Sequence, residues 1–299
     1  MFIRLIYVLI FSSTLVVLLG FLNTIHPFFD SLAHFRVHFL IILASLLVLL
    51  FFMLRSKMRY IIAFIILSIF VYLYTLIQRF DSIPSVVVEE HITMMQFNLN
   101  FRNKNLDKVQ DCLLKKSIDI ATFQEVTHAH KAKLEELRDK YPYQAYCEFA
   151  TVGGEMILSK YPFTGNGGCV KGQGLVWREI DAGNKKFSLV SLHLHWPYPY
   201  DQYNQITTLS KELEKIKGPI IVAGDFNAAP WSHAVDRIAK ASQSRVISGI
   251  RWSIKVDTPI APVWLPIDHI LSSGFISEQI TTGKDLGSDH LPILSTFVY

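Results

Sequence analysis

Three long apolar runs occupy the first part of this 299-residue chain, at residues 2–22, 37–54 and 60–77. Each run has about the length that an α-helix needs to cross the hydrocarbon core of a bilayer. A cleaved secretion signal would account for the first run alone. A buried helical hairpin is disfavoured, because a globular core rarely contains three such helices without charged faces. The runs therefore predict a membrane anchor of three transmembrane helices within residues 1–80.

Basic residues near the ends of the runs predict how this anchor is oriented. Arg55, Lys57 and Arg59 lie between the second and third runs, and Arg4 lies at the start of the first. By the positive-inside rule, the N-terminus and the turn at 55–59 face the cytoplasm. Three spans then place everything after residue 78 on the other side. We expect a periplasmic or extracytoplasmic C-terminal domain, held at a bacterial inner membrane.

Charge and cysteine content exclude some classes of protein. The formal net charge is +4, a mild excess that includes the anchor and forms no concentrated basic stripe of the kind that coats nucleic acid. The three cysteines, Cys112, Cys147 and Cys169, show no CxxC or zinc-like spacing. At most one disulfide is available to them, and we expect none.

The residues after the anchor divide into a linker at 81–89 and one domain at 90–299. Short apolar segments alternate there with amphipathic ones, which predicts a mixed α/β sandwich of about 210 residues. We expect strands at 90–99, 118–123, 156–159, 175–181, 187–193, 219–223, 267–271 and 292–298, and helices at 106–116, 131–140, 201–216 and 231–241.

Polar side chains stand at the ends of several predicted strands. Asn98, Gln124-Glu125 and residues 224–227 end or follow apolar strands, and Ser288-Asp289-His290 precedes the last one. Strand ends are rigid positions that can aim side chains into one cleft. Burying such polar groups in a core is unfavourable unless they bind an ion or take part in catalysis. The pattern therefore predicts a hydrolytic enzyme.

Residues 224–227 read Gly-Asp-Phe-Asn and follow a fully apolar strand. In an extended chain Asp225 and Asn227 point the same way. A carboxylate beside a neutral amide suits a site that holds a hard cation and a phosphate together. Gly224 would let the backbone approach a ligand. The alternative is an ordinary turn, which these residue types also favour.

Three further residues are candidates for holding a cation. Glu125 at a strand end suits Mg²⁺ or Mn²⁺. Asn98 could bond a phosphate oxygen or a metal-bound water, and Asp289 could help to hold the cation or its water. A solvated loop acid is the alternative for Glu125, and a turn former is the alternative for Asn98.

The histidines supply candidates for proton transfer. Asp268 could orient His290, because a carboxylate that accepts one imidazole N–H raises the basicity of the other nitrogen. His290 could then deprotonate a water that attacks phosphorus. His193 and His195 share a strand face and either could donate to a phosphoryl oxygen; we favour His193. Glu155 could orient that histidine, although a surface acid explains it equally well.

These motifs, taken in their order along the chain, resemble those of the endonuclease/exonuclease/phosphatase superfamily, which includes enzymes like deoxyribonuclease I. The similarity extends from Ile92 to the C-terminus and omits the membrane region. It implies a four-layer α/β sandwich, in which two packed mixed β-sheets are flanked by helices. The motifs that carry it are Asn98, Gln124-Glu125, the His193 segment, Gly224-Asp225-Phe226-Asn227, Pro266-Ile267-Asp268-His269 and Ser288-Asp289-His290.

The resemblance also implies an activity and a role for each matching residue. The activity is hydrolysis of phosphodiesters or phosphomonoesters with Mg²⁺, or Mn²⁺ in its place. Glu125 would be the principal metal ligand, assisted by Asn98 and Asp289. The remaining roles would be positioning of water and phosphate by Asp225 and Asn227, transition-state stabilisation by His193, and acid/base chemistry by His290 with Asp268. The second histidine, His195, departs from the pattern.

The substrate is less constrained than the chemistry. Nucleic acid is the first hypothesis, because many enzymes of this kind cut it, but no clustered Lys/Arg loop is present. A phospholipid or sphingomyelin headgroup is the second, because the anchor holds the site near a bilayer. The aromatic segment at 196–203 could lie at a membrane interface or stack on bases. A catalytically inactive, membrane-tethered binding protein is a third, disfavoured because the acids and imidazoles are all present. No protein partner is inferable.

Overall fold

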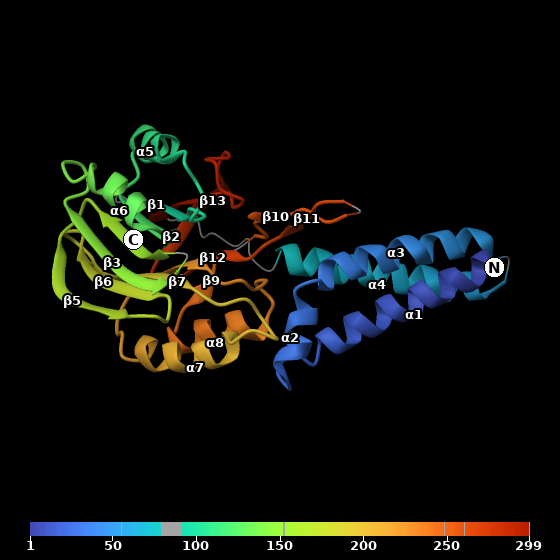
Figure 1. The fold of residues 1–299 in the computed structure, drawn as a ribbon. Helices are drawn as coiled ribbons and strands as arrows, with labels where there is room; N and C mark the ends of the chain where they lie inside the picture. Colours follow the sequence, from blue (N-terminus) through green and yellow to red (C-terminus); the bar gives the residue numbers. More distant parts are fainter. Residues whose placement is uncertain (55, 79–90, 152, 248, 260, 299) are drawn as a thin grey trace.

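The computed structural model describes residues 1–54, 56–78, 91–151, 153–247, 249–259 and 261–298. Figure 1 shows a bundle of long helices beside a rounded α/β body. The helices come from the N-terminal third of the chain, and the body is the C-terminal domain. The predicted linker at 81–89 lies outside the described residues.

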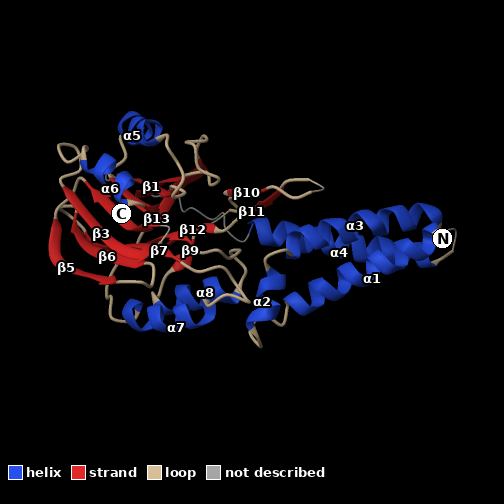
Figure 2. Cartoon of the chain, in the orientation of Figure 1, coloured by secondary structure: helices blue, strands red, loops and turns tan. Residues whose placement is uncertain are grey.

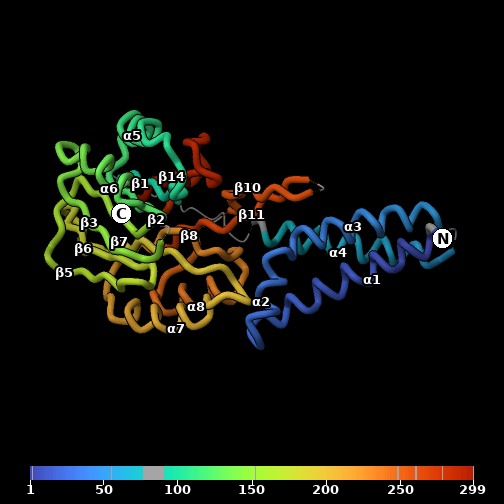
Figure 3. The backbone as a smooth tube through the Cα atoms, in the orientation of Figure 1, coloured from blue at the N-terminus to red at the C-terminus, as the bar shows by residue number. Residues whose placement is uncertain are grey.

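The predicted anchor consists of α1 (Phe2–Gly20), α3 (Arg36–Met53) and α4 (Met58–Gln78), with the short α2 (Pro27–Ala33) between the first two. The three long helices lie side by side (Figure 3) and share a core of buried aliphatic side chains such as Leu40, Leu43 and Leu47. All three are long and apolar enough to cross a membrane. Helix α2 was not predicted. Its N-cap is the ring of His26, which accepts a bond from the backbone N–H of Phe28.

Two six-stranded sheets form the centre of the C-terminal domain. The first has the order β13-β14-β1-β2-β4-β3 and the second the order β5-β6-β7-β8-β12-β9. The pair β1–β2 is parallel, and so is the pair β7–β8. The strands of the first sheet are β1 (His91–Asn98), β2 (Ile120–Val126), β3 (Tyr143–Ala150), β4 (Gly153–Ser159), β13 (Ile276–Thr282) and β14 (Ile293–Val298). Those of the second are β5 (Phe163–Val170), β6 (Leu175–Asp181), β7 (Lys186–His193), β8 (Ile220–Asp225), β9 (Arg245–Val246) and β12 (Asp268–Ser273).

The sheets pack face to face, and helices cover both outer faces (Figure 2). One apolar core lies between the sheets and includes Ile157 and Ile221. A second joins the first sheet to α5 (Leu106–Lys115) and α6 (His128–Glu135). A third joins the second sheet to α7 (Gln202–Leu213) and α8 (His233–Ala241). The predicted four-layer sandwich is therefore confirmed.

Some local predictions were wrong. Helix α6 begins at His128 rather than 131, because the Thr127 side chain accepts a bond from the His130 N–H and caps the helix there. Strands β3, β5 and β13 were not predicted, because their polar or glycine-rich sequences lack a clear apolar alternation. The hairpin of β10 (Ile254–Val256) and β11 (Val263–Leu265) was also missed.

The expectation of no disulfide was wrong as well. Cys147 on β3 is bonded to Cys169 on β5, with 5.6 Å between their Cα atoms. These are edge strands of different sheets, so the bond ties the two sheets together along one side. Sequence spacing cannot reveal such a pair, because only the folded sandwich brings the two edges together.

Candidate functional site

Strands from both sheets end at one edge of the sandwich. Asn98 ends β1 opposite Gln124 of the parallel β2. His193 ends β7 opposite Asp225 of the parallel β8. Strand β12 runs antiparallel to β8 and begins here, with Asp268 opposite Asp225. The fold thus brings to one place side chains that are far apart in the sequence, as predicted.

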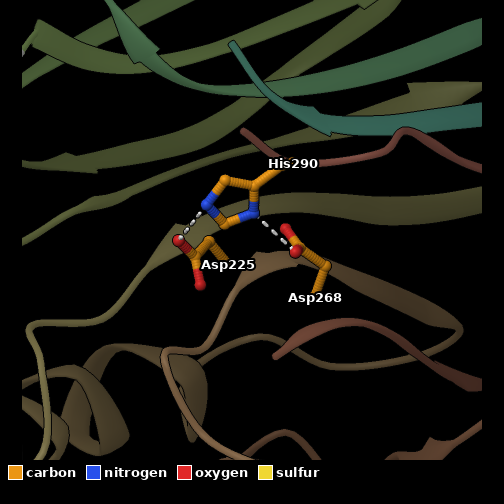
Figure 4. Close-up of side chains that lie close together, drawn as sticks. All are labelled: Asp225, Asp268 and His290. Carbon is orange, nitrogen blue, oxygen red and sulfur yellow. Dashed lines mark hydrogen bonds and ion pairs between the residues drawn. The ribbon is translucent and has the colours of Figure 1, made fainter. Parts of the chain in front are cut away.

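His290 and Asp268 form a buried pair at this edge. The His290 Nδ1 lies 2.7 Å from Asp268 Oδ2, and Figure 4 shows the ring between Asp268 and Asp225. Gln96 holds the other oxygen of Asp268 through its Nε2 at 3.0 Å. Burial alone would lower the pKa of His290, but the carboxylates of Asp268 and Asp225 outweigh it and raise the pKa to about 10. These two carboxylates therefore favour the protonated form of the imidazole.

Asp225 lies at the centre of the site. Its Oδ2 is 3.6 Å from His193 Nε2 and 3.7 Å from His290 Nε2. The same oxygen accepts a bond from Asn98 Nδ2 at 3.0 Å. Burial, with the charge of Asp268 beside it, raises the pKa of Asp225 to about 6. One carboxylate oxygen therefore faces two imidazoles and an amide.

Of the two histidines after β7, His193 lies in the site and His195 does not contact its acids. His193 is buried, and its Nδ1 is 3.6 Å from Glu155 Oε1, the distance of an ion pair. Burial lowers the pKa of His193, but the Glu155 carboxylate more than compensates and raises it to about 9. Glu155 is fully buried rather than a surface acid. His195 is half-buried and its ring packs against Phe149.

An irregularity in β2 sets the direction of the Glu125 side chain. The ladder between β2 and β4 shifts register between Phe123 and Val126, and Glu125 has a left-handed backbone with φ of 54°. A bulge of this kind redirects a side chain, and such backbone strain is common at functional sites. Glu125 Oε1 accepts from Asn98 Nδ2 at 3.3 Å, and Oε2 accepts from the N–H of Phe101 at 2.9 Å.

Asp289 lies further out than the other predicted ligands. It is exposed, and its Oδ1 accepts from Asn100 Nδ2 at 2.8 Å. The backbone N–H of Asn100 in turn donates to Asn98 Oδ1 at 2.9 Å. Asp289 is thus linked to Asn98 through one residue rather than by direct contact.

Asn227 joins the site from the turn after β8. Its φ is 47°, and its N–H donates to Asp225 Oδ1 at 2.8 Å. Its Nδ2 donates to Leu194 O, while its buried Oδ1 has no partner among the described residues. A Cβ at Gly224 would lie 1.8 Å from Leu192 O. The glycine therefore permits close packing of β8 on β7, and the approach of a ligand to its backbone stays a prediction.

Sequence reasoning missed a polar layer between the sheets. Gln96 Nε2 donates to Gln124 Oε1 at 2.9 Å, and Gln124 Nε2 donates to Ser191 Oγ at 2.9 Å. Ser191 is 3.5 Å from Glu155. The chain of bonds connects Asp268 to Glu155 beneath the site and fixes both acids. The available signal was polar Gln96, two residues before Asn98 and so on the same strand face.

The oxygen-rich donor set fits a hard divalent cation. The ligand atoms of Asp225, Asp268 and His290 lie within 4.8 Å of one another, which makes this group a candidate metal site within the described part of the chain. Glu125 and Asn98 add a carboxylate and an amide next to Asp225, and the unpaired Asn227 oxygen adds another acceptor. Carboxylate and amide oxygens are the protein ligands that Mg²⁺ and Mn²⁺ prefer. The specific ligands Glu125, Asn98 and Asp289 stay a prediction.

An open cleft of about 730 Å³ lies beside Glu125. Its walls come from the segment after β1 and the starts of α5 and α6, and they include Phe101, Arg102, Lys104, Asp107 and Lys133. Lys133 is paired with Asp107, so the positive excess of the lining comes from Arg102 and Lys104. This excess favours an anionic molecule in the cleft.

Comparison with known proteins supports the fold and the site region. The model of the Endonuclease/Exonuclease/phosphatase family matches residues 95–290, more than half of the chain. Among curated proteins, a UPF0294 protein of Vibrio campbellii is 29% identical over 119 residues, 39% of this chain and 41% of that protein. A UPF0294 protein of Vibrio cholerae is 33% identical over 112 residues, 36% of this chain and 39% of that protein. The chain thus matches about two fifths of these relatives' length.

Solved structures show the same fold at low sequence identity. An endonuclease/exonuclease/phosphatase family protein from Leptotrichia buccalis has a TM-score of 0.56 at 12% identity, covering 70% of this chain and 100% of that one. TDP2 of D. rerio, complexed with a single-strand DNA product, has a TM-score of 0.57 at 16% identity, covering 71% of this chain and 100% of that one.

Proposed function

Because the chain belongs to the endonuclease/exonuclease/phosphatase family, we propose that it is a phosphodiesterase that depends on a divalent metal. The observation that carries the proposal is the convergence of Asp225, Asp268 and His290 with His193 and Glu125 at one edge of the sandwich. Members of this family are generally hydrolases of phosphate esters. In this chain Asp225, Asp268, His193 and His290 are buried close together, and Glu125 lies half-buried beside them.

The metal would be held by Glu125, Asn98 and Asp289, and Mg²⁺ or Mn²⁺ would neutralise charge on the phosphate as a Lewis acid. The protein supplies the remaining stabilisation. His193, protonated through its contact with Glu155, would donate to a phosphoryl oxygen. Asn227 would position the attacking water and the phosphate through its free amide oxygen.

Proton transfer in the proposed reaction is shared by Asp225 and His290. A water oxygen forms a bond to phosphorus, and the P–O bond to one alcohol breaks. His290 gives its Nε2 proton to the departing oxygen, and Asp225 takes the proton of the water. The 3.7 Å between these groups allows the proton to return to His290 afterwards. This reverses the expectation that His290 is the base, because its neighbouring carboxylates keep it protonated.

We further propose that this site works outside the cytoplasm, with the N-terminus on the cytoplasmic side. The N-terminus and the start of α4 lie at the end of the bundle far from the C-terminal domain (Figure 1). Arg4, Lys57 and Arg59 lie in or next to these two segments, in keeping with the positive-inside rule. The disulfide between Cys147 and Cys169 fits an oxidising compartment such as the periplasm.

The test uses the full chain in detergent micelles with Mg²⁺ and the water-soluble diester bis(p-nitrophenyl) phosphate. We expect hydrolysis by the native protein. We expect His193→Ala to lower kcat by about 10²-fold, the effect of removing one charged donor. His195→Ala is the matched control and should stay within about threefold. No hydrolysis by the native protein would refute the proposal, and equal losses in both variants would refute the assignment of His193.

A further inference from the structure

The connection between α1 and α3, which includes α2, is bonded to the C-terminal domain. The carboxylate of Asp30, on α2, accepts bonds from the backbone N–H groups of His233 at 2.7 Å and Ala234 at 2.9 Å, where α8 begins. Trp231 Nε1 donates to Ala33 O at 2.7 Å. Figure 1 shows α2 at the junction of the long helices and the C-terminal domain, on the side where α8 lies. A buried carboxylate that caps a helix holds the two parts in one orientation.

The segments that contact the anchor are those that carry the site residues. Ser31 Oγ donates to Tyr198 O at 3.1 Å, five residues after His193. Trp231 follows Asn227 by four residues, and Trp264, whose carbonyl lies 3.0 Å from His38 Nε2, precedes Asp268 by four. Three chain segments that lead away from site residues therefore contact α2 or α3. The edge of the sandwich that bears the site faces the apolar helices.

Exposed aromatic side chains gather on these same segments. We define the aromatic rim as Trp196, Tyr198, Tyr200 and Trp264, which are 48%, 46%, 66% and 38% exposed. Tyr198 extends the rim onto the anchor, because its ring packs edge-on against Phe28 of α2. None of the four carries a charge. Trp and Tyr in such positions are typical of the layer between lipid headgroups and hydrocarbon.

The hairpin β10–β11 connects the rim to the acid/base pair. The carbonyl of Ser253, just before β10, accepts from the N–H of Leu291 at 2.7 Å. The Ser253 hydroxyl accepts from the N–H of Asp268 at 3.1 Å. Ile254 bridges to His290 itself. Figure 1 shows the hairpin pointing along the anchor, in the direction of the long helices. A few hydrogen-bonded residues thus connect the exposed Trp264 to the site.

We propose that the aromatic rim rests in the headgroup layer of the membrane and that the site hydrolyses the phosphodiester of a membrane lipid. This inference rests on the proposed phosphodiesterase function and names its substrate class. The fixed contacts of Asp30 and Trp231 leave the site facing the bilayer, where lipid headgroups are the most concentrated phosphodiesters. The products are the two halves of the headgroup ester: a phosphomonoester and an alcohol, with one water consumed.

The experiment compares two substrates for the full chain reconstituted into vesicles of phosphatidylethanolamine and phosphatidylglycerol. One is the vesicle lipid, followed by release of phosphorylated headgroup or headgroup alcohol, and the other is bis(p-nitrophenyl) phosphate in solution. In the double variant Trp196→Ser/Tyr200→Ser we expect the ratio of lipid to soluble turnover to fall about tenfold or more. Leu114→Ser is the matched control: Leu114 is 45% exposed, lies at the end of α5 away from the site, and should leave the ratio unchanged.

A second measurement places the rim directly. Lipids brominated near the headgroup should quench the tryptophan fluorescence of the native protein, and the variant Trp196→Phe/Trp264→Phe should lose most of that quenching. Absence of quenching in the native protein overturns the proposal. The proposal is also overturned if plasmid DNA is cleaved faster than vesicle lipid and the rim variant changes neither rate. In that case the proposed phosphodiesterase function still holds. No hydrolysis of any substrate, the soluble diester included, refutes the proposed function itself.

Discussion

Replacing Asp268 by Asn tests the acid/base pair with the smallest change in shape. The oxygen that accepts from Gln96 is retained, but the charge 2.7 Å from His290 Nδ1 is lost. At an effective dielectric constant of about 20, two charges at this separation attract by about 6 kcal/mol, which is an upper limit for the effect on the imidazolium. General acid/base catalysis contributes about 10²–10⁴ in rate, or roughly 3–5 kcal/mol. The second estimate lies below this upper limit, so we expect kcat to fall by about 10²–10⁴.

The assay is steady-state hydrolysis of bis(p-nitrophenyl) phosphate, with kcat and KM determined separately and thermal unfolding measured in parallel. We expect KM to change little, because Asp268 acts through His290 and does not touch the substrate. The matched control is Asp119→Asn, a bonded carboxylate before β2 that accepts from Thr93 and Lys160 at the other end of the sandwich. A kcat within about threefold of the native value would refute the role of the pair. An equal loss in the control would show that the effect is structural.

The remaining predictions concern the metal ligand, the acid, the disulfide and a buried histidine. Glu125→Ala and His290→Ala should each abolish turnover while circular dichroism shows an intact fold; near-native hydrolysis by either variant would refute the role of that residue. Cys147→Ser should destabilise the domain by about 3 kcal/mol, because it opens a loop of 22 residues, and lower Tm by roughly 6–12 °C. Cys112→Ser, at a free cysteine, should leave Tm nearly unchanged, and equal shifts would contradict this account. His34, whose pKa burial lowers from 6.5 to about 4, binds a proton in the unfolded chain before it does so in the folded one. Stability should therefore fall by up to about 3 kcal/mol between pH 6.5 and 4, and His34→Asn should lose less; an identical acid dependence of Tm in both proteins would disprove this reasoning.

The sequence predicted the parts of the molecule that depend on local patterns. Long apolar runs predicted the three long helices, and strands such as β6 (Leu175–Asp181) were placed correctly by their alternation. Polar residues at strand ends predicted that Asn98, Asp225 and Asp268 would meet. These inferences succeed because burial of an apolar strand fixes where its polar end must emerge.

Features that depend on contacts between distant segments were not predicted. The hydrogen bonds of Gln96 and Ser191 cross from one sheet to the other. The local sequence around either residue does not indicate which distant residue it bonds to. The same is true of Asp30, whose carboxylate caps a helix more than 200 residues later. The environment of His290 was likewise hidden from the sequence, because its pKa depends on Asp225 as well as Asp268.

The most direct test of the central claim is the metal dependence of phosphodiester hydrolysis by the purified full-length protein. The rate is measured before and after removal of divalent ions by EDTA, and again after Mg²⁺ is added in excess. The account predicts a fall to background with the chelator and recovery with Mg²⁺ in the native protein, with no recovery in Glu125→Ala. Hydrolysis that continues unchanged in EDTA would contradict it.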